Sequence, residues 1–249
     1  MQLSIIMPFL NSHEIVRRQL VYMKAQQYPD DVEIIFLDDG SDPPIEVGEE
    51  LPQNFRLHTT NEFRPWTSSL ARNLGATLAK GKYLFLIDGD YILTREAVER
   101  ARNFEGDRLG TRRRFGVLDP NGELRTDSET LLEYGLVPSL ANRRRRFMPP
   151  HPNQFVMRKT LFEEMGGYDE QRILTIEYPQ REDNDFKRRL SQMIQAGTVT
   201  QTDGNRPEVY MFPNGQFCGD VDYNPFDLFH ELSRKTDRNF WYSHNRYKE

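Results

Sequence analysis

Two carboxylates separated by one residue give the clearest chemical signal in the sequence. Asp88 and Asp90 flank Gly89 directly after the apolar run Tyr83–Ile87. Carboxylates this close repel each other unless a proton or a cation lies between them, and a turn through glycine can bring them together. Oxygen ligands suit Mg²⁺ or Mn²⁺, which commonly bridge carboxylates and substrate phosphates. The pattern indicates a divalent-metal site, although taken alone it also fits an ordinary polar turn.

A second acidic loop strengthens that interpretation. Asp38 and Asp39 precede Gly40 and Ser41 at the end of another apolar run, Val32–Leu37. A carboxylate there can accept a hydrogen bond from a base N–H or a ribose hydroxyl. The sequence contains neither G-x-G-x-x-G after its first apolar run nor G-x-x-x-x-G-K-[ST]. A nucleotide site with a metal is therefore expected, but not that of a dinucleotide-dependent dehydrogenase or a P-loop enzyme.

The elements that must position these residues alternate between strand and helix over the first ninety residues. A helix is predicted after Asn11, which stands three residues before Glu14 in an N-cap arrangement, and another from Ser68 or Ser69. The predicted strands are Leu3–Met7, Val32–Leu37, Phe55–Thr59 and Tyr83–Ile87. This order predicts an α/β fold with a mostly parallel central sheet flanked by helices, and ligands at the carboxyl ends of the strands.

The second half is less regular. An Asn-Gly turn predicts a hairpin within Val117–Leu124, and the stretch 125–152 reads as irregular. A strand is predicted at Gln154–Met157 and helices at Leu161–Met165 and Asp185–Ala196. We expect one domain over 1–249, with a nucleotide-binding half at 1–95, an irregular acceptor-side half at 96–222 and a helical, aromatic tail at 223–249.

Composition limits the function classes. The chain has 249 residues, 37% hydrophobic and 12% aromatic, which favours a folded protein over a disordered one. A single cysteine excludes an internal disulfide framework and a Cys-based zinc site. Apolar runs are far shorter than the roughly 20 residues needed to span a bilayer, and no signal-peptide pattern precedes Leu3. A cytoplasmic protein without a transmembrane segment is expected.

The formal net charge of −5 conceals two basic runs, Arg112–Arg114 and Arg143–Arg146. Such runs are usually solvated faces, but they can also contact nucleic acid or another polyanion. Both interpretations stay open.

Six motifs in order resemble the family 2 glycosyltransferases, which have the GT-A fold. They are SIIMPFLN at residues 4–11, LDDGSD at 37–42, ARNLGA at 71–76, GKYLFLIDGD at 81–90, GGYDE at 166–170 and REDNDF at 181–186. The resemblance is close over residues 3–93 and loose over 153–192.

The resemblance implies roles for individual residues. The nucleotide-sugar donor would be bound by Pro8, Phe9, Asn11, Asp39, Arg72, Asp88 and Gly89. Asp90 and Asp88 would hold Mn²⁺ or Mg²⁺, with His230 or His244 as a possible third ligand, and Asp183 would be the general base. Further acceptor-side candidates are Glu182, Gly167, Trp66 and His151.

These roles imply an inverting transfer of sugar from a nucleotide-diphosphate sugar, most readily UDP-linked, to an acceptor hydroxyl. The acceptor is open, and a polyanion such as modified DNA is one candidate. One alternative is a nucleotidyltransferase that forms a nucleotide sugar, although Asn11-Ser12-His13 supplies no glycine-rich loop. The other is a catalytically inactive binding protein of the same fold. Oligomeric state is not indicated.

Overall fold

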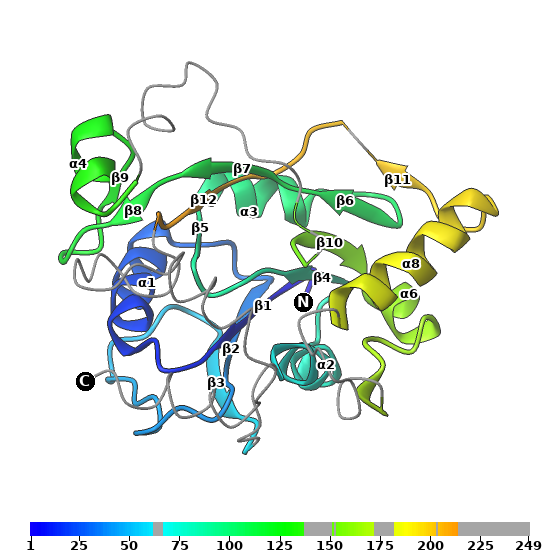
Figure 1. Ribbon diagram of the computed structural model, residues 1–249, viewed down its shortest axis with the longest axis horizontal. Helices are drawn as coiled ribbons and strands as arrows, with labels where there is room; N and C mark the ends of the chain where they lie inside the picture. The colour runs from blue at the N-terminus through cyan, green and yellow to red at the C-terminus, as the bar shows by residue number, and fades with distance from the viewer. Residues whose placement is uncertain (62–66, 137–150, 152, 172–181, 203, 214–249) are drawn as a thin grey trace, which may run out of the picture.

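A mixed β-sheet forms the centre of the molecule (Figure 1). The computed structural model describes residues 1–61, 67–136, 151, 153–171, 182–202 and 204–213. In this part of the chain the main sheet has seven strands in the order β11-β6-β10-β4-β1-β2-β3. The bounds are β1 Leu3–Phe9, β2 Val32–Asp38, β3 Phe55–Thr59, β4 Tyr83–Leu86, β6 Arg108–Gly110, β10 Phe155–Arg158 and β11 Gln201–Thr202.

Four of the six pairings in this sheet are parallel, which confirms the predicted mostly parallel sheet. Strand β1 pairs in parallel with both β2 and β4, and β2 with β3. Strand β10 runs antiparallel to β4 and β6, whereas β11 is parallel to β6. The sequence predicted the strand at β10 but not its direction.

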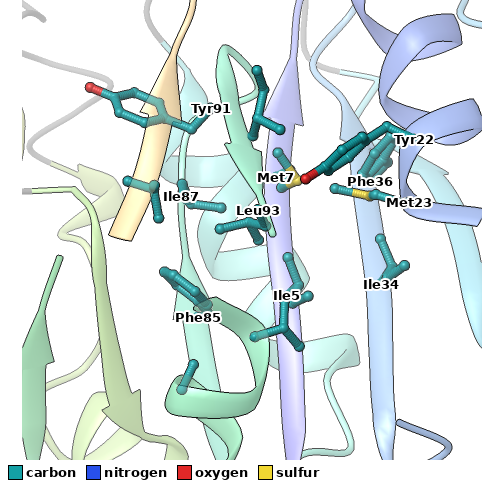
Figure 2. Close-up of a cluster of buried hydrophobic side chains, with 14 of the residues drawn as sticks. Ile5, Met7, Tyr22, Met23, Ile34, Phe36, Phe85, Ile87, Tyr91 and Leu93 are labelled. Carbon is teal, nitrogen blue, oxygen red and sulfur yellow. The ribbon is translucent and has the colours of Figure 1, made fainter. Parts of the chain in front are cut away.

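Both faces of the central strands are buried, which explains their continuous apolar runs. Side chains alternate between two clusters: Ile5 and Met7 of β1 belong to one, and Ile6 between them belongs to the other. The first cluster packs against α1 (His13–Gln26) and α3 (Arg95–Arg102), the second against α2 (Ser68–Leu78), α6 (Lys159–Glu164) and α8 (Glu182–Gln195). Figure 2 shows the first cluster, including Ile34, Phe36, Phe85, Ile87, Leu93 and the α1 side chains Tyr22 and Met23.

Helix α2 packs unusually closely on the sheet. The predicted apolar residues Leu70, Leu74 and Leu78 are only partly buried, whereas Ala71 and Gly75 face the strands. A Cβ at Gly75 would lie 2.5 Å from Cγ2 of Ile6, so a larger side chain would push the helix away from β1. The close approach brings the preceding turn of α2, which contains Ser68 and Arg72, to the carboxyl end of the sheet.

A second, smaller sheet has three strands in the described residues. Its order is β5 (Tyr91–Leu93), β12 (Glu208–Met211), β7 (Arg112–Phe115), with β12 antiparallel to β5 and parallel to β7. The predicted hairpin is confirmed as β8 (Val117–Leu118) and β9 (Leu124–Arg125), which pair antiparallel. Because β5 starts one residue after Asp90, this sheet reaches the acidic turn.

Two local predictions are wrong. The stretch 125–152 is not wholly irregular, because Asp127 accepts a hydrogen bond from the Thr130 N–H and starts helix α4 (Ser128–Glu133). Asn11 does not cap α1: the N-cap is Ser12, without a side-chain cap bond. Asn11 instead adopts φ 48°, its N–H donates to Oγ of Ser41, and its Oδ1 accepts from the Asp42 N–H. Competing bonds to the neighbouring loop therefore replaced the expected cap.

Several predicted features lie outside the described residues: Trp66, Arg143–Arg146, His230, His244 and the tail from 223. Within the described part of the chain, no helix is long and apolar enough to cross a bilayer.

Candidate active site

The two acidic loops lie side by side at the carboxyl ends of β1, β2 and β4. Phe9 is opposite Asp38 in the parallel register, and the N–H of Asp39 donates to the Phe9 carbonyl at 2.8 Å. Gly89 lies against the same residue, since a Cβ there would come within 2.5 Å of the Phe9 ring. The Phe9 ring itself is in the core, 4.5 Å from Phe36 between centroids. The glycine thus lets the 88–90 turn pack onto the end of β1.

The two neighbouring aspartates of the first loop, Asp38 and Asp39, make different contacts. Asp38 is fully buried, and its carboxylate accepts the N–H groups of Ser41 and Ile45, so it shapes the loop. Asp39 accepts hydrogen bonds from the hydroxyls of Thr60 (3.1 Å) and Thr67 (3.0 Å). Those two bonds fix the orientation of the Asp39 carboxylate while a carboxylate retains lone pairs for further donors.

Arg72 links the first loop region to the second. Its side chain is only 2% exposed, its Nη1 donates to Oγ of Ser68 at 3.0 Å, and its Nη2 forms an ion pair with Asp88. Ser68 directly follows Thr67, which bonds Asp39. The predicted donor residues Asp39, Arg72 and Asp88 are therefore joined through the start of α2.

The Asp88 carboxylate also meets the second half of the chain. Its Oδ2 accepts from Nε2 of Gln154 at 3.2 Å and lies 3.7 Å from Nδ1 of His151. Gln154 is 1% exposed and immediately precedes β10. Gln154 is a site residue that the sequence did not reveal, because a glutamine beside a strand has no distinguishing pattern.

Asp90 is in a different electrostatic environment from Asp88. Burial and the nearby charge of Asp88 raise the pKa of Asp90 to about 7, with the charges of Arg113 and Arg72 opposing the shift. Its backbone carbonyl accepts from the N–H of Phe212 at 3.1 Å, which ties the turn to the strand β12. The two carboxylates are crowded enough to disfavour two negative charges.

This donor set fits a hard divalent cation. Paired carboxylate oxygens are what Mg²⁺ and Mn²⁺ accept, and a cation would relieve the repulsion that raises the pKa of Asp90. Among the described residues, no group of three His, Cys, Asp or Glu side chains gathers closely enough to hold a metal without help. Substrate phosphates and water would complete the coordination, as is common for Mg²⁺.

His151 lies between two acidic groups. Burial lowers its pKa, and the charges of Arg113 and Arg72 add to that effect, while Asp88 and Asp183 oppose it. Asp183 is thus near enough for its charge to act on the same imidazole as Asp88. Nδ1 of His151 accepts from the Asn153 N–H at 3.3 Å, which leaves Nε2 to carry the proton of the neutral ring. His151 and Asp183, 32 positions apart by number, therefore approach the acidic turn together.

The predicted acceptor-side residue Gly167 has a structural reason to be glycine. It adopts φ +59°, and a Cβ would lie 2.6 Å from Oδ1 of Asn73. Its carbonyl accepts from Nη2 of Arg189 at 2.6 Å. This loop holds Tyr168, whose ring stacks on Phe186 of α8 at 4.6 Å and whose hydroxyl donates to Asn153. A role of Gly167 in acceptor binding stays a prediction, as does that of Glu182, the first residue of α8.

The basic run 112–114 does not form one surface patch. It is strand β7, whose alternation exposes Arg112 and Arg114 and turns Arg113 inward. Nε of Arg114 pairs with Glu208 at 3.0 Å, whereas Nη1 of Arg113 donates to the hydroxyl of Tyr91 at 2.8 Å. The three arginines therefore do not share one exposed face, and contact of this run with nucleic acid stays a prediction. Period-two alternation was the signal that could have separated Arg113 from its neighbours.

A mostly parallel sheet with acidic turns at its carboxyl edge defines a GT-A glycosyltransferase fold. The family model "Glycosyl transferase family 2" matches residues 4–165. The chain belongs to this family, which confirms the resemblance seen in its motifs.

Individual relatives are distant. Glycosyltransferase GlyG of Streptococcus pneumoniae serotype 4 is 27% identical over 99 residues, which cover 39% of this chain and 33% of GlyG. The chain thus matches about a third of that relative's length. Mannosyltransferase PcManGT from Pyrobaculum calidifontis, solved with GDP-Man and Mn²⁺, is 14% identical with a TM-score of 0.51, covering 85% of this chain and 56% of its own. S. aureus TarS 1–349 with UDP is 17% identical with a TM-score of 0.44, covering 74% and 53%.

Proposed function

We propose that the chain transfers a sugar from a nucleotide-diphosphate sugar, UDP-linked, to an acceptor hydroxyl with inversion at the anomeric carbon. One observation carries the proposal. A continuous series of contacts runs from Asp39 through Thr67 and Ser68 to Arg72, and then from Asp88 to His151. Membership of family 2 supports the same activity.

The donor half supplies recognition. Asp39, held by two threonine hydroxyls, accepts the ring N–H of a pyrimidine base. Arg72 keeps Asp88 oriented at the diphosphate end of the site, since its buried guanidinium is fixed by Ser68 as well. The base, the ribose and the diphosphate then lie in that order along the sheet edge, from β2 toward β4.

Asp183 is the proposed general base. As the acceptor oxygen attacks the anomeric carbon, the bond from that carbon to the diphosphate oxygen breaks, and the hydroxyl proton passes to the Asp183 carboxylate. Attack opposite the leaving group inverts the centre in one displacement, so no second nucleophilic carboxylate is required. Neutral His151, beside Asp88 and Asp183, donates from Nε2 to a substrate oxygen and orients it.

Asp90 and Asp88 are the proposed ligands of Mn²⁺ or Mg²⁺. Bound there, the cation supplies charge neutralisation for the departing diphosphate. The Mn²⁺ in the PcManGT complex supports this assignment.

A nucleotide panel tests the proposal. UDP and GDP, with Mn²⁺, Mg²⁺ or EDTA, are added to the chain while thermal unfolding and slow hydrolysis of UDP-sugars are measured. A ligand that binds only the folded state at 100 times its Kd stabilises it by about 2.7 kcal/mol. UDP with metal is expected to do so, and GDP stabilising more would change the assigned base.

Asp90→Asn is expected to abolish the metal-dependent part of the stabilisation, because one anionic ligand is lost. Asp30→Asn is the matched control, since Asp30 is an exposed aspartate at the amino end of β2. Equal responses from the two variants would contradict the assigned metal site. Binding of UDP without any donor hydrolysis would favour the inactive alternative.

The acceptor remains a prediction. Contact with nucleic acid through Arg112–Arg114 or through Arg143–Arg146, which lie outside the described residues, stays a prediction, as does the cytoplasmic location.

A further inference from the structure

We propose that Arg113 is a positioning residue of the donor site, which holds the Asp90 carboxylate in position through Tyr91. This inference rests on the proposed function and adds to it a residue outside the six motifs. Arg113 comes from the second half of the chain, 23 positions after Asp90 by number.

The strand geometry turns Arg113 toward the site. Within β7 the even-numbered Arg112 and Arg114 are exposed, whereas Arg113 is partly buried and Phe115, on the same face, is in the core. The partner of Arg113 across the ladder is Val209 of β12, which in turn pairs with Leu93 of β5. The arginine therefore approaches β5, the strand that begins immediately after Asp90, from within the small sheet.

Tyr91 is the residue through which Arg113 reaches the turn. Nη1 of Arg113 donates to the Tyr91 hydroxyl at 2.8 Å. Tyr91 is 2% exposed and bonded to Asp90 by the peptide chain, and its N–H donates to the Asp88 carbonyl at 3.1 Å. Figure 2 shows its hydroxyl pointing away from the labelled core side chains. A fixed Tyr91 therefore fixes the backbone on the carboxyl side of the 88–90 turn.

Arginines from opposite halves of the chain hold the two ends of the 88–90 turn. Arg72 forms an ion pair with Asp88 at the start of the turn. Arg113 donates to the hydroxyl of Tyr91, which directly follows Asp90. The turn is therefore held at both ends by residues outside it.

The consequence is a preorganised carboxylate pair. If Arg113 is absent, the Tyr91 hydroxyl loses its hydrogen-bond donor, so binding of a metal–diphosphate must first reorganise the turn. The loss should therefore appear in the affinity for UDP with Mn²⁺ rather than in UDP binding without metal.

Calorimetric titration of the full chain tests this. UDP is titrated into protein with Mn²⁺ and, separately, with EDTA, for the wild type, Arg113→Gln and Arg112→Gln. Arg112 is the matched control, because it is the adjacent arginine of the same strand and is exposed. Arg113→Gln is expected to weaken Mn²⁺-dependent UDP binding by about 10–100-fold, the usual effect of losing an outer-shell partner of a metal ligand. Arg112→Gln should match the wild type.

A double-mutant cycle separates positioning from direct contact. If Arg113 acts through Asp90, Arg113→Gln should have little further effect in the Asp90→Asn background. Equal losses in both backgrounds would mean that Arg113 contacts the nucleotide itself and would overturn the proposal. Affinity of Arg113→Gln equal to that of Arg112→Gln would also overturn it. A wild type that binds no UDP with Mn²⁺ would instead refute the proposed function.

Tyr91→Phe covers the case in which Arg113→Gln does not fold. It removes only the hydroxyl that Arg113 binds, and it is expected to weaken Mn²⁺-dependent UDP binding by about tenfold. Unchanged affinity in this variant would contradict the route through Tyr91.

Discussion

The two halves of the candidate site are built differently. In the half before residue 95, Asp39, Asp88 and Asp90 each follow a buried strand within four residues, so strand and functional group are one local motif. In the half after residue 95, Arg113 comes from a strand, Asp183 from the start of a helix and His151 from outside any helix or strand, with no common pattern. The comparison teaches that the acidic turns of the candidate site are encoded locally, whereas the residues that the second half contributes depend on long-range packing.

The largest effect is expected in helix α8, where one variant should lose sugar transfer and a second should lose only stability. Asp183→Asn is expected to lower sugar transfer by about 10²–10⁴-fold, because the proposed general base is lost. UDP affinity and thermal stability should stay near the wild-type values.

Asp185→Asn is the contrasting variant. Asp185 is buried and binds Arg188 and Arg189, and Arg189 holds the carbonyls of Met165 and Gly167. This variant should lose stability but retain turnover per folded molecule. If Asp183→Asn keeps the full rate of sugar transfer, the assignment of the general base to Asp183, in the second half of the chain, is contradicted.

An intermediate effect is expected where the halves are joined. Arg18 of α1 is 7% exposed, and its Nη1 donates to the carbonyl of Leu118 and to the hydroxyl of Tyr134. Arg18→Met should cost about 1–3 kcal/mol of unfolding free energy, because buried acceptors lose their donor. Urea denaturation measures the loss.

The adjacent Arg17 provides an exposed comparison. Its Nη2 also donates to the hairpin, at the Pro120 carbonyl (2.9 Å), but its side chain is 50% exposed. Arg17→Met should stay within about 0.5 kcal/mol of the wild type. If the two variants lose equal amounts of unfolding free energy, α1 and the β8–β9 hairpin are not held together by Arg18.

The smallest effect concerns pH. Hydrogen bonds from Arg17 and then Arg18, together with their charges, lower the pKa of Glu14 from 4.5 to about 2, against a smaller opposing effect of burial. The stabilisation is therefore present above pH 4.5 and is lost as pH falls toward 2.

Because Glu14 is 47% exposed, solvent screening limits the effect to less than about 1 kcal/mol. The urea midpoints of the wild type and Glu14→Gln should converge as the pH is lowered from 5 to 2. A constant difference over that range would exclude the ion pair as its source.

The sequence by itself determined the family, the order of strand and helix to residue 87, and the acidic turns at the sheet edge. Strands that are buried on both faces of a sheet need continuous apolar runs, and glycines allow the sharp turns that follow them. Both the strands and the turns can therefore be recognised from the local sequence. Gly89 shows this directly, since only glycine fits against the Phe9 ring.

Only the tertiary structure decided the inward turn of Arg113, the antiparallel direction of β10, and the pinning of Asn11 by Ser41 and Asp42. Each depends on a partner at least 22 residues away along the chain, and such pairings are selected by packing and hydrogen bonding in the folded state. Local propensity contains no information about a partner that distant. The run of three arginines therefore did not show that Arg113 turns inward while Arg112 and Arg114 are exposed.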